Sequence, residues 1–129
     1  MNTNNSAVKG IGNDILEVDR LQKAIDRHGQ HLIEKIFTIR EQDYCYKFSN
    51  PSERFTGRFA AKEAIAKALG TGIGKQVNWH DIEILNDEEN GKPNVILSDR
   101  IKKAFNNPKI LVSISHTNNY ASAVAIWTA

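Results

Sequence analysis

The residues best suited to chemistry lie in one segment, RFAAKEAIAKALGTGIG, residues 58–74. On a helix at about 100° per residue, Arg58 and Lys62 fall within the apolar arc that ought to be buried. Two like charges four residues apart weaken a helix by a few tenths of a kcal/mol, so we expect an anion near them. Glu63 precedes Lys67 by four residues, the order in which a carboxylate and an ammonium pair favourably. Spacing alone leaves a plainer alternative open, in which the basic side chains extend into water past apolar stems and Glu63–Lys67 is a surface salt bridge.

The glycines that follow, GTGIGK, do not predict a phosphate-binding P-loop. A P-loop precedes a helix and ends in Lys followed by Ser or Thr, whereas these glycines follow a helix and Gln76 follows Lys75. The negative end of the helix dipole points at such a loop and repels anions. We therefore expect Gly70 to end the helix.

Two further positions could contact a ligand. His116 lies where a strand meets a turn, and a half-exposed imidazole at such a place can bind a ligand. The nearby Ser113 and Ser115 lack the GxSxG context of a hydrolase nucleophile. Asp14 and Glu63 are of the type that binds Mg²⁺, which commonly takes one or two carboxylates together with water and substrate phosphates. The sequence leaves open whether these two carboxylates meet.

The first half of the chain is predicted to be mainly helical. A short strand at residues 8–11 leads to Asp14, and Asn50, Pro51 and Glu53 form the clearest helix start, for a helix of about five turns that ends at Gly70. Three shorter helical pieces are expected between them, one from Asp19 to Gly29, one around residues 33–37, and one opened by a capping box of Thr38 and Glu41.

The second half is predicted to be mainly antiparallel. Alternating residues 81–85 and 94–97 form one hairpin, Ser98 caps a short helix, and residues 110–116 and 120–127 form a second hairpin. We therefore expect one α+β domain over residues 8–129, preceded by a disordered tail over residues 1–7.

Composition excludes several classes of protein. Of 129 residues 40% are hydrophobic and 25% charged, and no apolar run approaches the roughly 20 residues of a membrane span. The net charge is only +2 and no aromatic and basic surface is evident, so nucleic acid is not an expected partner. The polar start, MNTNNSA, does not resemble a secretory signal, and the single Cys45 suits a reducing compartment. We expect a cytoplasmic protein.

Four blocks together resemble the holo-acyl-carrier-protein synthase family of small 4'-phosphopantetheinyl transferases. The blocks span residues 10–20, 57–74, 79–93 and 113–126, and they occur in the order and spacing of that family. The resemblance implies the α+β fold of these transferases and a homotrimer with active sites between subunits. It also implies that the phosphopantetheine arm of coenzyme A is transferred to a serine of apo acyl carrier protein, releasing adenosine 3',5'-bisphosphate in fatty-acid biosynthesis. The alternative is a non-catalytic module that keeps this fold and binds coenzyme A.

The resemblance also implies roles for particular residues. Asp14 and Glu63 would bind Mg²⁺, with Mn²⁺ as an alternative, Glu63 or a water acting with it would be the base, and Lys62 would lie beside the coenzyme A diphosphate. The residues that would contact or border coenzyme A are Arg58, Lys62, Lys67, Gly70, His116 and Thr117. Arg20 and Arg27, two helical turns apart on one face, would dock the acidic carrier protein.

Overall fold

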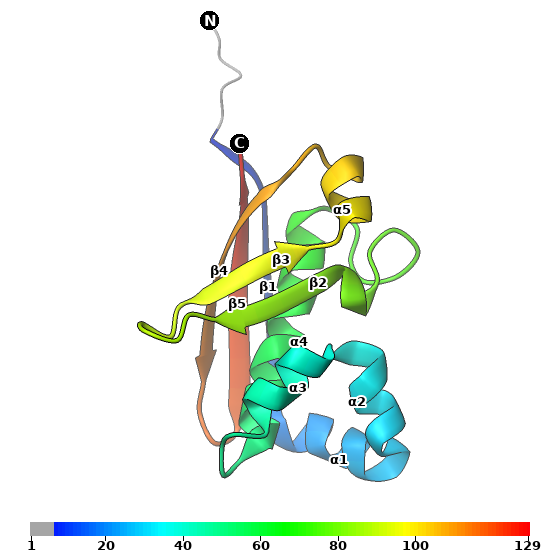
Figure 1. Ribbon diagram of the computed structural model, residues 1–129, viewed down its shortest axis with the longest axis vertical. Helices are drawn as coiled ribbons and strands as arrows, with labels where there is room; N and C mark the ends of the chain where they lie inside the picture. The colour runs from blue at the N-terminus through cyan, green and yellow to red at the C-terminus, as the bar shows by residue number, and fades with distance from the viewer. Residues whose placement is uncertain (1–6) are drawn as a thin grey trace, which may run out of the picture.

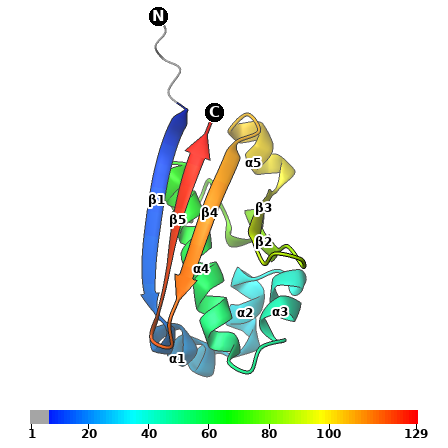
Figure 2. The ribbon, with the colours of Figure 1, turned by 90° about the vertical axis from the view of Figure 1, so that its left-hand side faces the viewer.

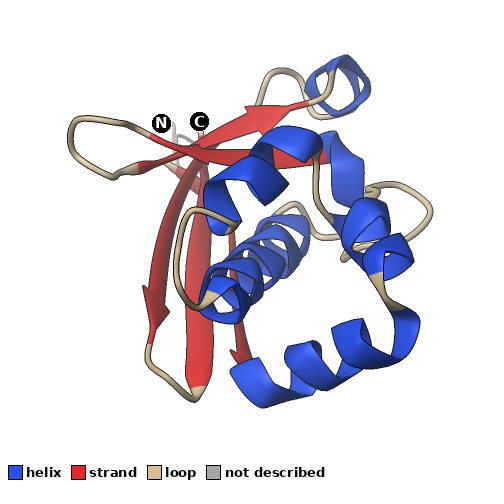
Figure 3. Cartoon of the chain, turned by 60° about the horizontal axis from the view of Figure 1, so that its bottom comes forward, coloured by secondary structure: helices blue, strands red, loops and turns tan. Residues whose placement is uncertain are grey.

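A central helix, α4 (Pro51–Ala68), organises the molecule. The computed structural model describes residues 7–129, so the tail predicted over residues 1–7 lies, except for Ala7, outside the described residues. A three-stranded sheet packs on one side of α4, and the shorter helices and a separate hairpin cover its other sides (Figures 1 and 2). The view in Figure 3 shows the helices gathered on one face of that sheet.

The other elements follow one another along the chain with these bounds. They are β1 (Val8–Glu17), α1 (Val18–His28), α2 (Gln30–Ile36), α3 (Ile39–Cys45), the 3-10 helix η1 (Trp79–Asp81), β2 (Ile82–Asn86), β3 (Pro93–Leu97), α5 (Asp99–Ala104), β4 (Lys109–His116) and β5 (Tyr120–Thr128).

The strands form two antiparallel sheets. The larger has the order β1-β5-β4, and β2 pairs with β3 in a separate hairpin. In the larger sheet Asp14 pairs with Ala123, and Ala123 pairs with Ile114 on the far strand. The α+β class with antiparallel strands is confirmed, and the two predicted hairpins prove to belong to different sheets.

Helix α4 is buried on nearly all sides. Its buried residues include Phe55, Ile65, five alanines and both cations of the opening segment, Arg58 and Lys62. The prediction of one apolar stripe was therefore too narrow. Snorkelling is also excluded, because the Lys62 side chain has no exposed surface.

Two glycines of β1 allow this strand to lie directly on α4. A Cβ added to Gly10 would lie 2.0 Å from Ala68 O, and one added to Gly12 would lie 2.1 Å from Ala64 O. Any side chain at these positions would therefore push the strand from the helix. The close contact fixes how far the inner face of β1 lies from α4.

Local signals placed most element ends correctly. The Thr38–Glu41 capping box forms at the start of α3, Gly29 with φ 70° ends α1, and α4 begins at Pro51. Two details differ: β1 continues to Glu17, and Asp81 lies in η1 rather than in a strand. Within residues 7–129 no helix is both long and apolar enough to cross a membrane.

Candidate active site

Three predicted residues meet where β1 crosses α4. Asp14 lies on the inner face of β1, and the Lys67 ammonium is 3.3 Å from Asp14 Oδ1 and donates a hydrogen bond to Asn13 O at 3.0 Å. Glu63 lies one turn before Lys67 on the same helix. The structure therefore brings Asp14, Glu63 and Lys67 together, and Lys67 pairs with Asp14 across the two elements.

The electrostatics of this cluster favour a cation. Burial raises the pKa of Glu63, the negative charge of Asp14 raises it further, and Lys67 opposes the rise. Among the described residues no three His, Cys, Asp or Glu side chains converge as a complete metal cage. Two carboxylates beside an open position are, however, what Mg²⁺ takes when substrate phosphates supply further ligands, so the donor set fits that ion.

Lys62 lies elsewhere, on the core side of α4. Its ammonium is 2.7 Å from Glu41 Oε1 and donates to the carbonyl oxygens of Ile36, at 2.7 Å, and Trp79, at 3.1 Å. All three of its donors are used inside the chain. The anion near Lys62 is thus the carboxylate of Glu41, whereas the family resemblance implied that Lys62 lies beside the diphosphate of coenzyme A.

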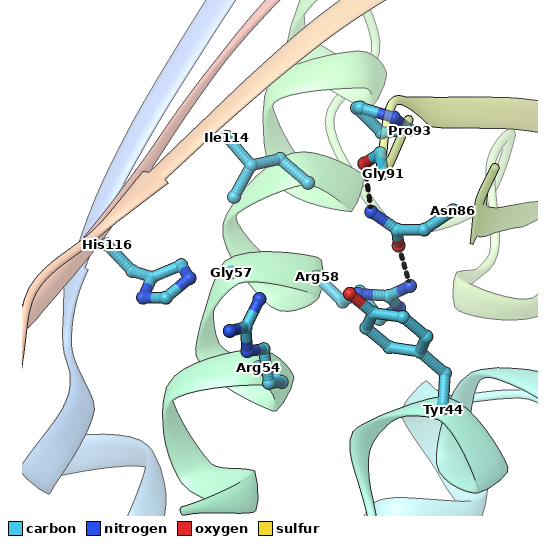
Figure 4. A pocket seen from close by; sticks show the side chains of 9 residues that line it. All are labelled: Tyr44, Arg54, Gly57, Arg58, Asn86, Gly91, Pro93, Ile114 and His116. Carbon is cyan, nitrogen blue, oxygen red and sulfur yellow. Dashed lines mark hydrogen bonds between the residues drawn. The ribbon is translucent and has the colours of Figure 1, made fainter. Parts of the chain in front are cut away.

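Arg58 forms one wall of a pocket between α4, β4 and the β2–β3 hairpin (Figure 4). Its guanidinium lies 4.1 Å from the ring centroid of Tyr44 and donates a hydrogen bond to Asn86 Oδ1. Asn86 in turn donates to Gly91 O at 2.8 Å. An aromatic face and an amide from two different elements therefore hold the guanidinium in place.

The pocket has the character of an anion site. It encloses about 150 Å³, and Arg54 extends between His116 on one side and the Arg58 guanidinium, beside Tyr44 and Asn86, on the other (Figure 4). Arg58 Nε and His116 Nδ1 are buried without a hydrogen-bond partner. Glu53 Oε1 lies 3.4 Å from His116 Nδ1 and is the nearby carboxylate. The buried Arg58 Nε is a donor left unpaired, which costs free energy, and a bound anion would satisfy it.

The carboxylate cluster and the pocket lie on different sides of α4. Arg58 and Glu63 are five residues apart, which is about 140° around the helix. Asp14 lies on β1 and His116 lies on β4. These are the two edge strands of the sheet, and they are separated by β5 and so lie about 10 Å apart. One chain therefore presents two separate half-sites.

The remaining predicted residues lie outside the carboxylate cluster and the lining of the pocket. Thr117 is in the β4–β5 turn, where its hydroxyl accepts hydrogen bonds from the amides of Asn119 and Tyr120. Gly70 has φ 85° and follows the last turn of α4, which confirms its role as a helix stop. Arg20 and Arg27 are both exposed on α1.

Other nucleophile candidates are not part of either half-site. Cys45 is fully buried, and burial raises the pKa of its thiol to about 12, so the thiolate is not available. Ser113 and Ser115 are exposed on the outer face of the sheet.

Comparison with known proteins identifies the family. The family model described as the 4'-phosphopantetheinyl transferase superfamily matches residues 10–125, nearly the whole chain. The chain belongs to this superfamily.

Two similar relatives carry the same name. The chain is 54% identical over 116 residues to the holo-[acyl-carrier-protein] synthase of Chlamydia caviae, covering 90% of this chain and 93% of the relative. It is 49% identical over 120 residues to that of Protochlamydia amoebophila, covering 93% and 98%. The crystal structure of the Helicobacter pylori synthase in complex with coenzyme A superposes with a TM-score of 0.83 at 33% identity, covering 92% of this chain and 99% of that one.

For this member of the superfamily, sequence reasoning missed several residues of the pocket and the core. Arg54 and Asn86 line the pocket, Tyr44 stacks on Arg58, and Glu41 pairs with Lys62. Glu41 was noticed only as part of a helix cap. The unpaired cations in an apolar arc were the one signal for such partners, and they did not indicate which residues those were.

Proposed function

We propose that the protein transfers the 4'-phosphopantetheine group of coenzyme A to a serine hydroxyl of apo acyl carrier protein, releasing adenosine 3',5'-bisphosphate, as a step of fatty-acid biosynthesis. The observation that carries this proposal is the meeting of Asp14, Glu63 and Lys67 at the crossing of β1 and α4. Relatives at 49% and 54% identity that are named holo-[acyl-carrier-protein] synthases support it.

Asp14 and Glu63 would hold Mg²⁺, or Mn²⁺, together with the coenzyme A diphosphate. When bound, the ion would neutralise charge on the phosphoryl oxygens and so make adenosine 3',5'-bisphosphate a better leaving group. Lys67, already turned toward Asp14, would stabilise charge on the same phosphates as it develops. Glu63, or a water acting with it, would accept the serine proton.

The pocket on the other side of α4 would bind the nucleotide end of coenzyme A. Arg58, Arg54 and His116 line it, and a 3'-phosphate would accept hydrogen bonds from the two guanidinium groups, including the unpaired Nε of Arg58. Thr117 directly follows His116 in the chain and Gly70 follows the last turn of α4, and both would contact or flank the same substrate. Lys62 has no exposed surface through which it could join these contacts.

A complete site would form between two copies of the chain in a homotrimer. The 3'-phosphate and the diphosphate of coenzyme A are attached to one ribose, yet α4 lies between the two half-sites of a single chain. The outer face of the sheet supports assembly, since Ile11, Ile126 and Leu111 stand side by side on its three strands and two of them are more than half exposed.

Helix α1 would dock the carrier protein. Arg20 and Arg27 are exposed there, and opposite charge on the partner would speed encounter and set its orientation. The buried free thiol of Cys45 suits the cytoplasm, which is the compartment we propose for the reaction.

The test is intact-mass spectrometry of apo acyl carrier protein incubated with the purified protein, coenzyme A and Mg²⁺. The carrier protein should gain the mass of one phosphopantetheine group, and Glu63→Gln should abolish the gain while the protein stays folded. Absence of any gain in mass over a range of metal and substrate concentrations would reject the transferase activity. The alternative is a module that only binds coenzyme A, and isothermal titration calorimetry would detect that binding.

A further inference from the structure

The Glu41–Lys62 ion pair is buried in the centre of the molecule. Neither side chain has exposed surface, and the two charged atoms are 2.7 Å apart. The Glu41 carboxylate also accepts hydrogen bonds from the amides of Thr38, at 2.9 Å, and Ile84, at 2.8 Å. With the two carbonyl contacts of Lys62, the pair joins α2, α3, α4, η1 and β2.

Stability alone does not account for such a pair. Removing two charges from water costs several kcal/mol per ion, and apolar side chains of similar volume often stabilise a core equally well or better. An ion pair adds directional hydrogen bonds, which are satisfied at only one arrangement of the groups. The pair therefore fixes geometry.

Apart from Lys67, which bonds to Asn13 and Asp14, most of the buried α4 surface near Glu63 makes no directional bonds. Small side chains dominate the buried surface there: Ala60, Ala61, Ala64, Ala66 and Ala68. Methyl groups pack without directional bonds, so they limit how closely other elements approach but resist rotation of the helix about its axis only weakly. Lys62, next to Glu63 in sequence, bonds to three other elements.

We propose that Glu41 and Lys62 are positioning residues, which set the rotation of α4 about its axis and thereby hold the Glu63 carboxylate toward Asp14. The proposal rests on the proposed metal site. At a radius of about 6 Å from the helix axis, a rotation of about 10° moves a side-chain group by about 1 Å. A displacement of that size at a reacting group can cost about 10²-fold in rate.

The experiment replaces the pair by apolar side chains, in the double variant Glu41→Leu/Lys62→Met. The matched control is Ile101→Ala on α5, which removes apolar volume from the core but breaks no ion pair. For each protein, Mn²⁺ affinity is measured in the presence of coenzyme A by the electron paramagnetic resonance of free Mn²⁺. Phosphopantetheine transfer and thermal unfolding are measured in parallel.

We expect the double variant to fold, to bind Mn²⁺ about 10- to 100-fold more weakly and to lose a similar factor in kcat, as when groups that orient metal ligands are removed. Ile101→Ala should keep both values. Wild-type Mn²⁺ affinity and kcat in the double variant would overturn the proposal, because the pair would then serve stability alone. Wild-type affinity with no transfer would also overturn it, because Lys62 would then act on the substrate itself.

Two further results separate the alternatives. If the double variant does not fold, Glu41→Asp keeps the charge on a shorter side chain, and it should weaken Mn²⁺ binding in the same direction by a smaller factor; unchanged binding would count against the pair. If the wild type binds Mn²⁺ but transfers nothing, the proposed function fails, while weaker binding by the variants still supports the positioning role.

Discussion

Gly12 on β1 provides a sharp test of how the carboxylates of Asp14 and Glu63 are held together. We predict that Gly12→Ala will push β1 from α4, because the new Cβ would meet Ala64 O at 2.1 Å, Ala68 N at 2.7 Å and Lys67 Cβ at 2.9 Å. Two of these three atoms belong to the backbone, so rotation of a side chain cannot relieve the contact. Asp14 lies two residues along the same face of the strand and must move with it.

The size of the effect follows from the distances. Reaching 3.0 Å, the shortest separation that real Cβ atoms show, requires a displacement of about 0.9 Å. Overpacking of this kind costs about 1–3 kcal/mol of unfolding free energy. For a chain of this length that is a fall in Tm of roughly 3 to 15 °C. The same displacement between Asp14 and Glu63 should lower kcat by about 10²-fold.

The assay pairs phosphopantetheine transfer, followed by intact mass, with thermal unfolding monitored by circular dichroism. Gly74→Ala is the control, because an added Cβ there meets nothing within 4 Å and the residue has no positive φ. It should behave as the wild type. If Gly12→Ala retains the wild-type kcat and Tm, the close packing of β1 on α4 is not what positions the carboxylates.

Three further substitutions test the other parts of the site. In metal-free protein Glu63→Gln should raise Tm at pH 7, because the folded state holds the Glu63 pKa above its ordinary 4.5 and the charged form is therefore destabilising. The wild type regains this stability as the pH falls through the folded pKa of Glu63, so the difference in Tm should vanish below pH 4.5. An equal difference in Tm at all pH values would contradict this explanation. Asn86→Ala should free the Arg58 guanidinium and raise the KM for coenzyme A about tenfold, because one charge-assisted hydrogen bond is lost. The KM for dephospho-coenzyme A, which lacks the 3'-phosphate, should not change. Equal rises in both KM values would show that Asn86 does not act through binding of the 3'-phosphate. Arg20→Glu should raise the KM for the carrier protein more than that for coenzyme A, and equal changes in steady-state kinetics would count against α1 as the dock.

Much of the fold could be predicted because its signals are local. The Thr38–Glu41 capping box, Pro51 at the start of α4 and Gly70 after its end depend on residues within one helical turn of each other. Strand alternation likewise identified both hairpins. Each of these features is set by backbone geometry that the neighbouring residues determine.

The parts that could not be predicted depend on contacts between distant residues. Glu41 and Lys62 are 21 positions apart on different helices, and Arg58 and Asn86 are 28 apart. Alanine is weakly apolar, so the composition of α4 did not indicate that the helix is buried on nearly all sides. Asp14 and Glu63 were paired only through the family resemblance, because no spacing rule relates a strand residue to a helix residue 49 positions later.

The division of the half-sites between two faces of α4 has a genetic consequence. If each complete site combines the carboxylates of one chain with the pocket of another, an Asp14→Asn chain and an Arg58→Ala chain lack different halves. Each would be inactive alone. In a random mixture of the two, about one interface in four would pair two intact halves. Two defective alleles of a single gene would then complement each other, as alleles of two different genes ordinarily do.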